Sequence, residues 1–190
     1  MKKGLIFFLS FLFILSIFSQ TKKVVMIIAP SNFRDEELFV TKKVLEDEGI
    51  EVKVASVKKT SIHGMLGGSV IPDLELDEVN LDEFDGVIFV GGIGAQFYWG
   101  YEPALKLAQE AFRKGKVIGA ICIAPVILAN AGILKGKKAT VWPSEVRRIK
   151  AKDAIYIKTL VVKDGNVITA SGPQAAEKFG EMIAQALFEE

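Results

Sequence analysis

The sequence has very few residues of the types that form disulfide or metal-bound scaffolds. Among its 190 residues there is one Cys, Cys122, and one His, His63. A single Cys cannot form an internal disulfide, and one Cys with one His cannot supply the four ligands of a structural zinc site. We therefore expect no metal. The stability of the fold must come from a hydrophobic core, for which 50% hydrophobic residues are ample.

The chain also lacks an excess of charge of either sign. It has 24 Lys and Arg against 23 Asp and Glu, and without Lys2 and Lys3 the net charge is −1. A nucleic-acid binder needs an excess of basic residues to displace phosphate counterions, so that class is excluded, and a polybasic membrane patch is disfavoured. A short basic group, which we expect to be a solvated face, consists of Arg147, Arg148, Lys150 and Lys152.

Residues 1–20 differ from the rest of the chain. They contain thirteen hydrophobic residues and no acidic one, with Lys2 and Lys3 before an apolar run of 14 residues, 5–18. As a helix this run would be about 21 Å long, shorter than the roughly 30 Å hydrocarbon core of a bilayer. The layout is typical of a secretory signal and predicts an exported protein, periplasmic or secreted. The alternative is an uncleaved N-terminal membrane anchor.

From residue 22 onward, short apolar runs alternate with helical patterns. Strands are expected over 24–29, 52–57, 86–90, 117–121 and 139–142, with irregular strands within 62–76 and a hairpin of 156–162 and 167–170. Helices are expected over 37–49, 103–113, 124–131 and 173–187. Several strand runs are continuously apolar, as in strands that are buried on both faces of a parallel sheet. The alternation predicts one three-layer α/β domain over 22–190 with a mainly parallel sheet.

Cys122 directly follows the apolar run 117–121 and precedes a helix that opens at Pro125. Ala120 and Ala124 flank it at two residues on either side. A sharp strand-to-helix turn that projects a nucleophile needs small side chains at these positions. The helix N-terminus would favour the thiolate, so we expect a Cys122 pKa below about 8.5. The alternative is an inert buried Cys.

Two other loops follow strands at the edge of the sheet where parallel α/β folds place their chemistry. Gly91 and Gly92 follow the run 86–90, and backbone N–H groups there could face an oxyanion, although an ordinary tight turn has the same composition. Their spacing is not a dinucleotide fingerprint, and we expect no cofactor. Acidic residues 35–37 follow the first strand, where a helix start would favour them in any case.

The chain resembles the ThiJ/PfpI family over 23–187 in four pieces: the acidic loop ending in Glu37, the Gly91-Gly92 turn, Ala120-Ile121-Cys122 with Pro125, and Ser171-Gly172-Pro173. The resemblance implies a flavodoxin-like sandwich, usually a homodimer. It also implies that Cys122 is the nucleophile or oxidation site and that the carboxyl group of Glu37 hydrogen-bonds the sulfur. The N–H groups of Gly92 and Ile123 would be the oxyanion donors.

Both histidines of the family's sites are missing. Protease-like members have His directly after the nucleophile, where this chain has Ile123, and deglycase-like members have His before a Pro, where it has Trp142. We expect His63 to be a surface or loop residue. General acid–base catalysis must therefore come from Glu37. The ordinary pKa of a Glu side chain is about 4.3, so burial must raise the Glu37 pKa for this role. A peptidase, which must protonate an amine leaving group, is disfavoured.

Two classes of function follow. In the first, the Cys122 thiolate adds to a small reactive aldehyde, the glyoxalase or deglycase activity that the family implies. In the second, peroxide oxidises Cys122 in a redox sensor or scavenger, or the chain is a chaperone-like dimer. Oxidation needs the least acid–base help, so we expect ready conversion to the sulfinic state, weak or absent glyoxalase activity and no peptidase activity. An aromatic cluster lines the pocket or forms a packed or dimer-facing patch: Phe97, Tyr98, Trp99 and Tyr101.

Overall fold

The computed structural model of the protein describes residues 21–189. The predicted signal segment, 1–20, lies outside the described residues. Within 21–189, no helix combines the length and apolar character that a membrane crossing requires.

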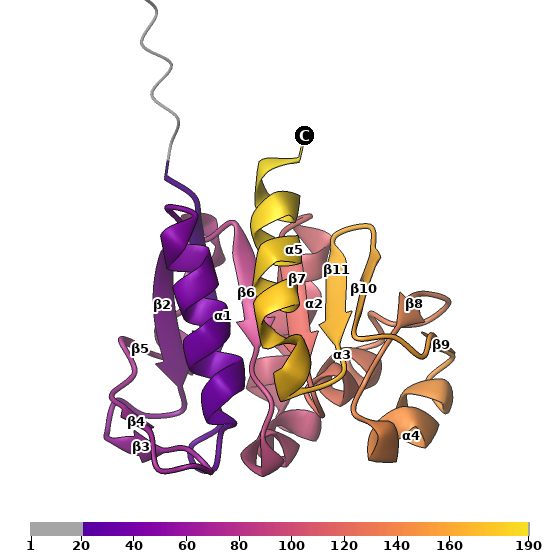
Figure 1. Ribbon diagram of the computed structural model, residues 1–190, viewed down its shortest axis with the longest axis horizontal. Helices are drawn as coiled ribbons and strands as arrows, with labels where there is room; N and C mark the ends of the chain where they lie inside the picture. The colour runs from indigo at the N-terminus through magenta and orange to yellow at the C-terminus, as the bar shows by residue number, and fades with distance from the viewer. Residues whose placement is uncertain (1–20, 190) are drawn as a thin grey trace, which may run out of the picture.

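A seven-stranded sheet runs through the centre of the described chain (Figure 1). Its order is β10 (Val161–Asp164), β11 (Val167–Ala170), β7 (Val117–Ile121), β6 (Gly86–Phe89), β1 (Lys23–Ile27), β2 (Glu51–Ser56) and β5 (Leu74–Glu75). Neighbouring strands are parallel except in the antiparallel β10–β11 hairpin. The parallel strands β2, β1, β6, β7 and β11 follow the 2-1-3-4-5 order of flavodoxin-like folds, which confirms the predicted fold class.

Helices cover both faces of the sheet, which makes the three layers. In Figure 1, α1 (Asp35–Asp47) and α5 (Ala176–Phe188) lie in front of it, and α2 (Glu102–Arg113) and α3 (Pro125–Asn130) lie behind. The front helices pack closely, because a Cβ on Gly180 of α5 would lie 2.9 Å from Val44 of α1. The Thr41 hydroxyl also donates a hydrogen bond of 3.2 Å to the carbonyl of Ala176.

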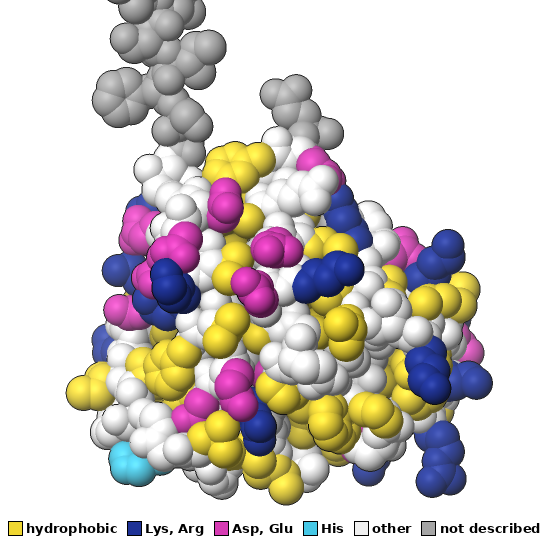
Figure 2. All heavy atoms as spheres, viewed as in Figure 1, with side chains coloured by type: hydrophobic (Ala, Val, Ile, Leu, Met, Phe, Trp, Pro, Cys, Tyr) yellow, Lys and Arg dark blue, Asp and Glu magenta, His cyan; other side chains and the backbone are white. Residues whose placement is uncertain are grey.

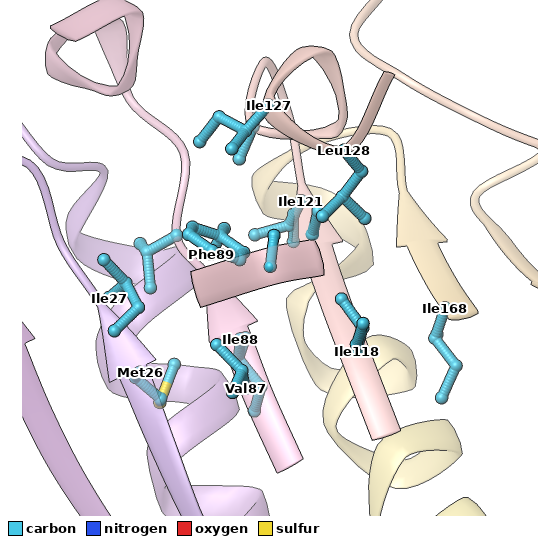
Figure 3. Packing of buried hydrophobic residues seen from close by; sticks show 14 of the residues in the cluster. Met26, Ile27, Val87, Ile88, Phe89, Ile118, Ile121, Ile127, Leu128 and Ile168 are labelled. Atoms are coloured by element: carbon cyan, nitrogen blue, oxygen red, sulfur yellow. The ribbon is translucent and has the colours of Figure 1, made fainter. Parts of the chain in front are cut away.

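The central strands form the hydrophobic core. Residues 24–27 of β1 and 118–121 of β7 are fully buried, as expected for strands with helices on both faces. Figure 3 shows side chains of β1, β6 and β7 packed with those of α3, including Ile27, Phe89 and Ile127. Gly119 of β7 lets α5 approach the sheet, since a Cβ there would lie 2.9 Å from the Phe179 ring.

The structure differs from the predicted elements mainly between β7 and β11. The strand expected over 139–142 is only β8 (Lys138–Ala139), which pairs with β9 (Ile155–Tyr156) in a separate two-stranded sheet. The hairpin strand expected over 156–162 is therefore divided between β9 and β10. A short helix, α4 (Val146–Lys150), was not predicted, because its five residues are too few for a helical pattern to be recognised.

Other short elements complete the described chain. They are the hairpin of β3 (Ile62–His63) and β4 (Ser69–Val70) and five 3₁₀ helices, η1 (Leu76–Glu78), η2 (Leu81–Glu83), η3 (Ile93–Trp99), η4 (Pro143–Glu145) and η5 (Pro173–Ala175). The carboxylate of Asp35, at the start of α1, accepts hydrogen bonds of 2.8 and 2.7 Å from the N–H groups of Leu66 and Gly68. These bonds fix the β3–β4 hairpin beside the N-terminal end of α1.

The basic group of the sequence lies at one end of the molecule, on and after α4. Its four side chains are exposed, and Figure 2 shows Lys and Arg side chains gathered on the side where Figure 1 places α4, β8 and β9. This agrees with the expected solvated face. All three loops that carry the candidate site leave the carboxyl ends of β1, β6 and β7, next to the point where the strand order reverses.

Candidate active site

Cys122 occupies a strained turn between β7 and α3. Its φ is +64°, a left-handed conformation that a residue with a side chain seldom adopts. Two backbone hydrogen bonds hold it there. The Cys122 N–H donates to the carbonyl of Ala170 at 2.9 Å, and the Cys122 carbonyl accepts from the Trp142 N–H at 2.8 Å. Ala120 and Ala124 are fully buried on either side. Strain of this kind, supported by its surroundings, is typical of functional sites.

Glu37 reaches the same point from the first turn of α1. Its side chain is fully buried, and its carboxyl group lies between α1 and the end of β6, beside Gly91. A Cβ on Gly91 would collide with Glu37 Oε2 and would lie 2.5 Å from Cys122 Cβ. Only glycine leaves room for the carboxyl and the cysteine to sit this close together.

The carboxyl of Glu37 has few polar neighbours for so deeply buried a group. Neither of its oxygens has a hydrogen bond of regular geometry among the described residues. The groups that face it are the Cys122 thiol and the Gly91 N–H. Burial therefore dominates and raises the Glu37 pKa from 4.5 to about 8, so the group is mainly protonated at neutral pH. This is the direction that the sequence predicted.

The N–H groups of Gly92 and Ile123 both face the sulfur of Cys122 and act to lower its pKa. Gly92 has φ +91°, and a Cβ there would collide with the backbone nitrogen of Arg34, so this position also requires glycine. The structure thus brings together the four residues expected at the site. Their chemical roles remain predictions.

The expected low pKa of Cys122 is wrong for the free protein. The Cys122 pKa is raised from 9.0 to about 12, mainly by burial of the thiol and next by the charge of the nearby Glu37 carboxyl. The two backbone donors do not outweigh these effects. The helix expected to stabilise the thiolate, α3, has only six residues, and Cys122 is 9% exposed. Loss of hydration therefore exceeds the helix effect.

A cavity of about 290 Å³ opens onto Cys122 and Glu37. Besides the four predicted residues, its walls include Arg34, Met65, Trp142, Glu145 and Pro173. Sequence reasoning passed over Arg34, Met65 and Glu145. They come from loops whose approach to the elbow depends on tertiary packing, and no local motif indicates them.

Besides Glu37, the cavity wall has two charged groups, Arg34 and Glu145, and each is paired with a neighbouring residue outside the wall. Arg34 Nε lies 2.8 Å from Glu36 Oε2, and a second nitrogen of the same guanidinium donates to Glu36 Oε1 at 3.1 Å. Glu145 accepts from the Ser144 hydroxyl at 2.8 Å and from Arg148 Nε at 2.7 Å. With Glu37 largely protonated, the cavity wall is close to neutral at neutral pH.

The aromatic cluster supports the site from outside the cavity. Tyr98 is buried and donates a hydrogen bond of 2.9 Å to the carbonyl of Ile28. Trp99 Nε1 donates to the carbonyl of Ile123 at 3.2 Å, directly behind the elbow. None of the four aromatic residues is among the residues that line the cavity. Of the two alternatives for this cluster, the structure therefore favours a packed or dimer-facing patch over a lining of the cavity.

No imidazole stands beside the sulfur. His63 is exposed on β3 and makes its interaction with the site loops through its backbone carbonyl, which accepts from the Asn32 N–H at 2.8 Å. The position expected for the family's histidine holds Trp142, which lines the cavity. Across residues 21–189, no cluster of His, Cys, Asp and Glu side chains could hold a metal ion.

The described residues thus form a flavodoxin-like sandwich in which an elbow cysteine lies beside a buried carboxyl. A model of the DJ-1/PfpI family matches residues 22–186, and the chain belongs to this family. The resemblance to this family that the sequence indicates is thus confirmed.

Relatives and solved structures agree with this assignment. An uncharacterised protein of Methanocaldococcus jannaschii is 45% identical over 168 residues, which are 87% of this chain and 82% of the relative. Deglycase PfpI of Pyrococcus furiosus is 36% identical over 78% of this chain and 90% of its own length. The crystal structure of a ThiJ/PfpI domain protein from Brachyspira murdochii superposes with a TM-score of 0.87 at 33% identity, covering 88% of this chain and 97% of that one.

Proposed function

We propose that the chain is a cysteine-dependent enzyme that acts on small reactive carbonyl compounds, in the manner of a glyoxalase or deglycase. The observation that carries the proposal is the contact pair at Gly91, where a protonated, fully buried Glu37 carboxyl meets the Cys122 thiol. Relatives named deglycase, including PfpI of Pyrococcus furiosus, support the same class of activity.

The proposed first step is addition of the thiol to an aldehyde. The sulfur forms a bond to the carbonyl carbon, the C=O π bond breaks, and the thiol proton leaves the sulfur. Glu37, which holds one proton at neutral pH, accepts this proton on one oxygen while its own proton goes to the carbonyl oxygen. The N–H groups of Gly92 and Ile123 stabilise negative charge at the sulfur or at the developing oxyanion.

With an α-oxoaldehyde, Glu37 would then move a proton between the two carbons of the hemithioacetal. This converts it to a thioester, which water hydrolyses to a hydroxy acid and the free thiol. No imidazole is present to speed these proton transfers, and a thiol with a pKa of about 12 is a weak nucleophile at neutral pH. We therefore expect slow turnover, and no peptidase activity, because no imidazole is present to take the thiol proton and pass it to an amine leaving group.

The proposal is tested by the conversion of methylglyoxal to lactate, measured as the loss of the aldehyde and the appearance of the acid. We expect slow conversion by the wild type and none by Cys122→Ser. Glu37→Gln should bind the aldehyde but lose turnover by about a hundredfold or more, the usual range for a general acid–base group. Conversion that persists in Cys122→Ser, or no conversion of any small aldehyde by the wild type, would reject the proposal.

A second candidate is oxidation of Cys122 by peroxide. One peroxide converts the thiol to sulfenic acid and water, and a second gives the sulfinic acid. The two N–H donors and the protonated Glu37 would stabilise the negative oxygens of that product. Intact mass after peroxide treatment should increase by two oxygen atoms in the wild type and not in Cys122→Ser. An unchanged mass would remove this candidate without affecting the first.

A further inference from the structure

Trp142 forms a wall of the cavity and is attached directly to the elbow. Its backbone N–H donates a hydrogen bond of 2.8 Å to the carbonyl of Cys122. Part of its indole ring lies against Gly172, where a Cβ would approach the Cε3 and Cζ3 atoms to 2.7 Å. The residue is still 38% exposed. Trp142 is therefore held on one side, and the remaining surface of the indole is open to a ligand at the sulfur.

The rest of the cavity complements an apolar group. Met65, Ile93 and Pro173 contribute apolar surface to its walls. Charged groups in the wall are occupied: Arg34 pairs with Glu36, and Glu145 with Arg148. A ligand with its own charge would have to compete with these pairs, whereas an apolar group gains by displacing water from the apolar walls.

The geometry points to a substrate class for the proposed carbonyl chemistry: we infer that Trp142 selects reactive carbonyl compounds whose substituent is bulky and apolar, aromatic above all, over those of the size of methylglyoxal. This inference rests on the proposed function for its substrate, but the binding preference itself does not require turnover. A phenyl substituent would stack on or against the indole, while a methyl group would leave the wall uncovered.

Alkylation of Cys122 measures the preference without catalysis. Phenacyl bromide and bromoacetone are α-bromoketones that differ in one substituent, phenyl or methyl, and both alkylate a thiolate with loss of bromide. Rates are measured by mass spectrometry at mildly alkaline pH, where the Glu37–Cys122 pair has released a proton. Each rate is divided by the rate of the same reagent with free N-acetylcysteine, which removes the difference in intrinsic reactivity.

We expect the normalised rates to favour phenacyl bromide by about tenfold or more, from burial of the phenyl group and its contact with the indole. Trp142→Ala should reduce the preference to about twofold, and Trp142→Phe should keep most of it, because an aromatic wall remains. Ile155→Ala is the matched control: Ile155 is an exposed apolar residue of β9 that does not line the cavity, and its removal should change nothing.

Several outcomes overturn the inference. It fails if wild type shows no preference beyond that of the free thiol, if Trp142→Ala retains the full preference, or if neither reagent reaches Cys122. Should Trp142→Ala not fold, the inference is still overturned if the wild type shows no preference or if Trp142→Phe loses it entirely. A clear phenacyl preference without turnover of phenylglyoxal or methylglyoxal would refute the proposed enzyme function and leave the selectivity of Trp142 standing.

Discussion

Replacing Glu37 by Gln tests the central electrostatic feature of the site, because Gln has nearly the same shape but cannot ionise. Burial raises the Glu37 pKa from 4.5 to about 8 in the folded chain. Between these two values the folded state holds a proton that the unfolded state has lost. The contribution of Glu37 to stability is therefore greatest below pH 4.5 and falls as the pH rises through about 8. The Gln variant has no such dependence.

The magnitude follows from linkage. One pKa unit corresponds to about 1.4 kcal/mol, so the wild type should lose about 3 to 4 kcal/mol relative to Glu37→Gln between about pH 5 and pH 8. Cys122 does not disturb this window, since its pKa is 9.0 or higher in both states. The comparison is the free energy of unfolding by urea at several pH values, followed by tryptophan fluorescence. Glu177→Gln, at an exposed position of α5, is the control.

The same variant should change the reactivity of the sulfur. In the wild type, the first proton lost by the Glu37–Cys122 pair leaves near pH 8, and the alkylation rate of Cys122 should rise there. Glu37→Gln should lack this step, and its Cys122 pKa should fall below about 12, because the carboxyl charge that opposes the thiolate is gone. A stability difference between the two proteins that stays constant with pH would show that Glu37 ionises normally, and the reasoning would be wrong.

Three further predictions concern the surroundings of the site. Gly91→Ala should destabilise the fold by about 2 kcal/mol or more in thermal unfolding and abolish alkylation of the thiol. Gly100→Ala is the control and should change neither the stability nor the alkylation rate, because its Cβ would meet no atom within 4 Å. Phe39 and Leu66 are exposed apolar side chains at the β3–β4 hairpin, and we expect them to form the contact surface of a homodimer. In sedimentation experiments, Leu66→Glu should weaken this dimer and Ile155→Glu should not. Intact mass of the protein from its native host should lack roughly the first twenty residues, and a full-length soluble product would contradict export.

Much of the fold follows from local patterns in the sequence. The continuous apolar runs of β1, β6 and β7 predict parallel strands because only strands buried on both faces can carry them. The elbow at Cys122 is also a local feature, since a sharp turn demands small residues two positions before and after it. The elbow thus follows from a local pattern, whereas the meeting of Glu37 with Cys122 was implied by the resemblance to the ThiJ/PfpI family.

Tertiary structure decided what those side chains can do. The pKa of Cys122 depends on how much water the whole fold removes from the sulfur and on a Glu37 carboxyl that comes from a different strand–helix connection. No local pattern contains either quantity, and the helix effect read from the sequence had the opposite sign. In the same way, the orientation of Trp142 results from its contact with Gly172, thirty residues further along the chain. Burial and contacts between distant segments are sums over the folded molecule, so only the folded molecule determines them.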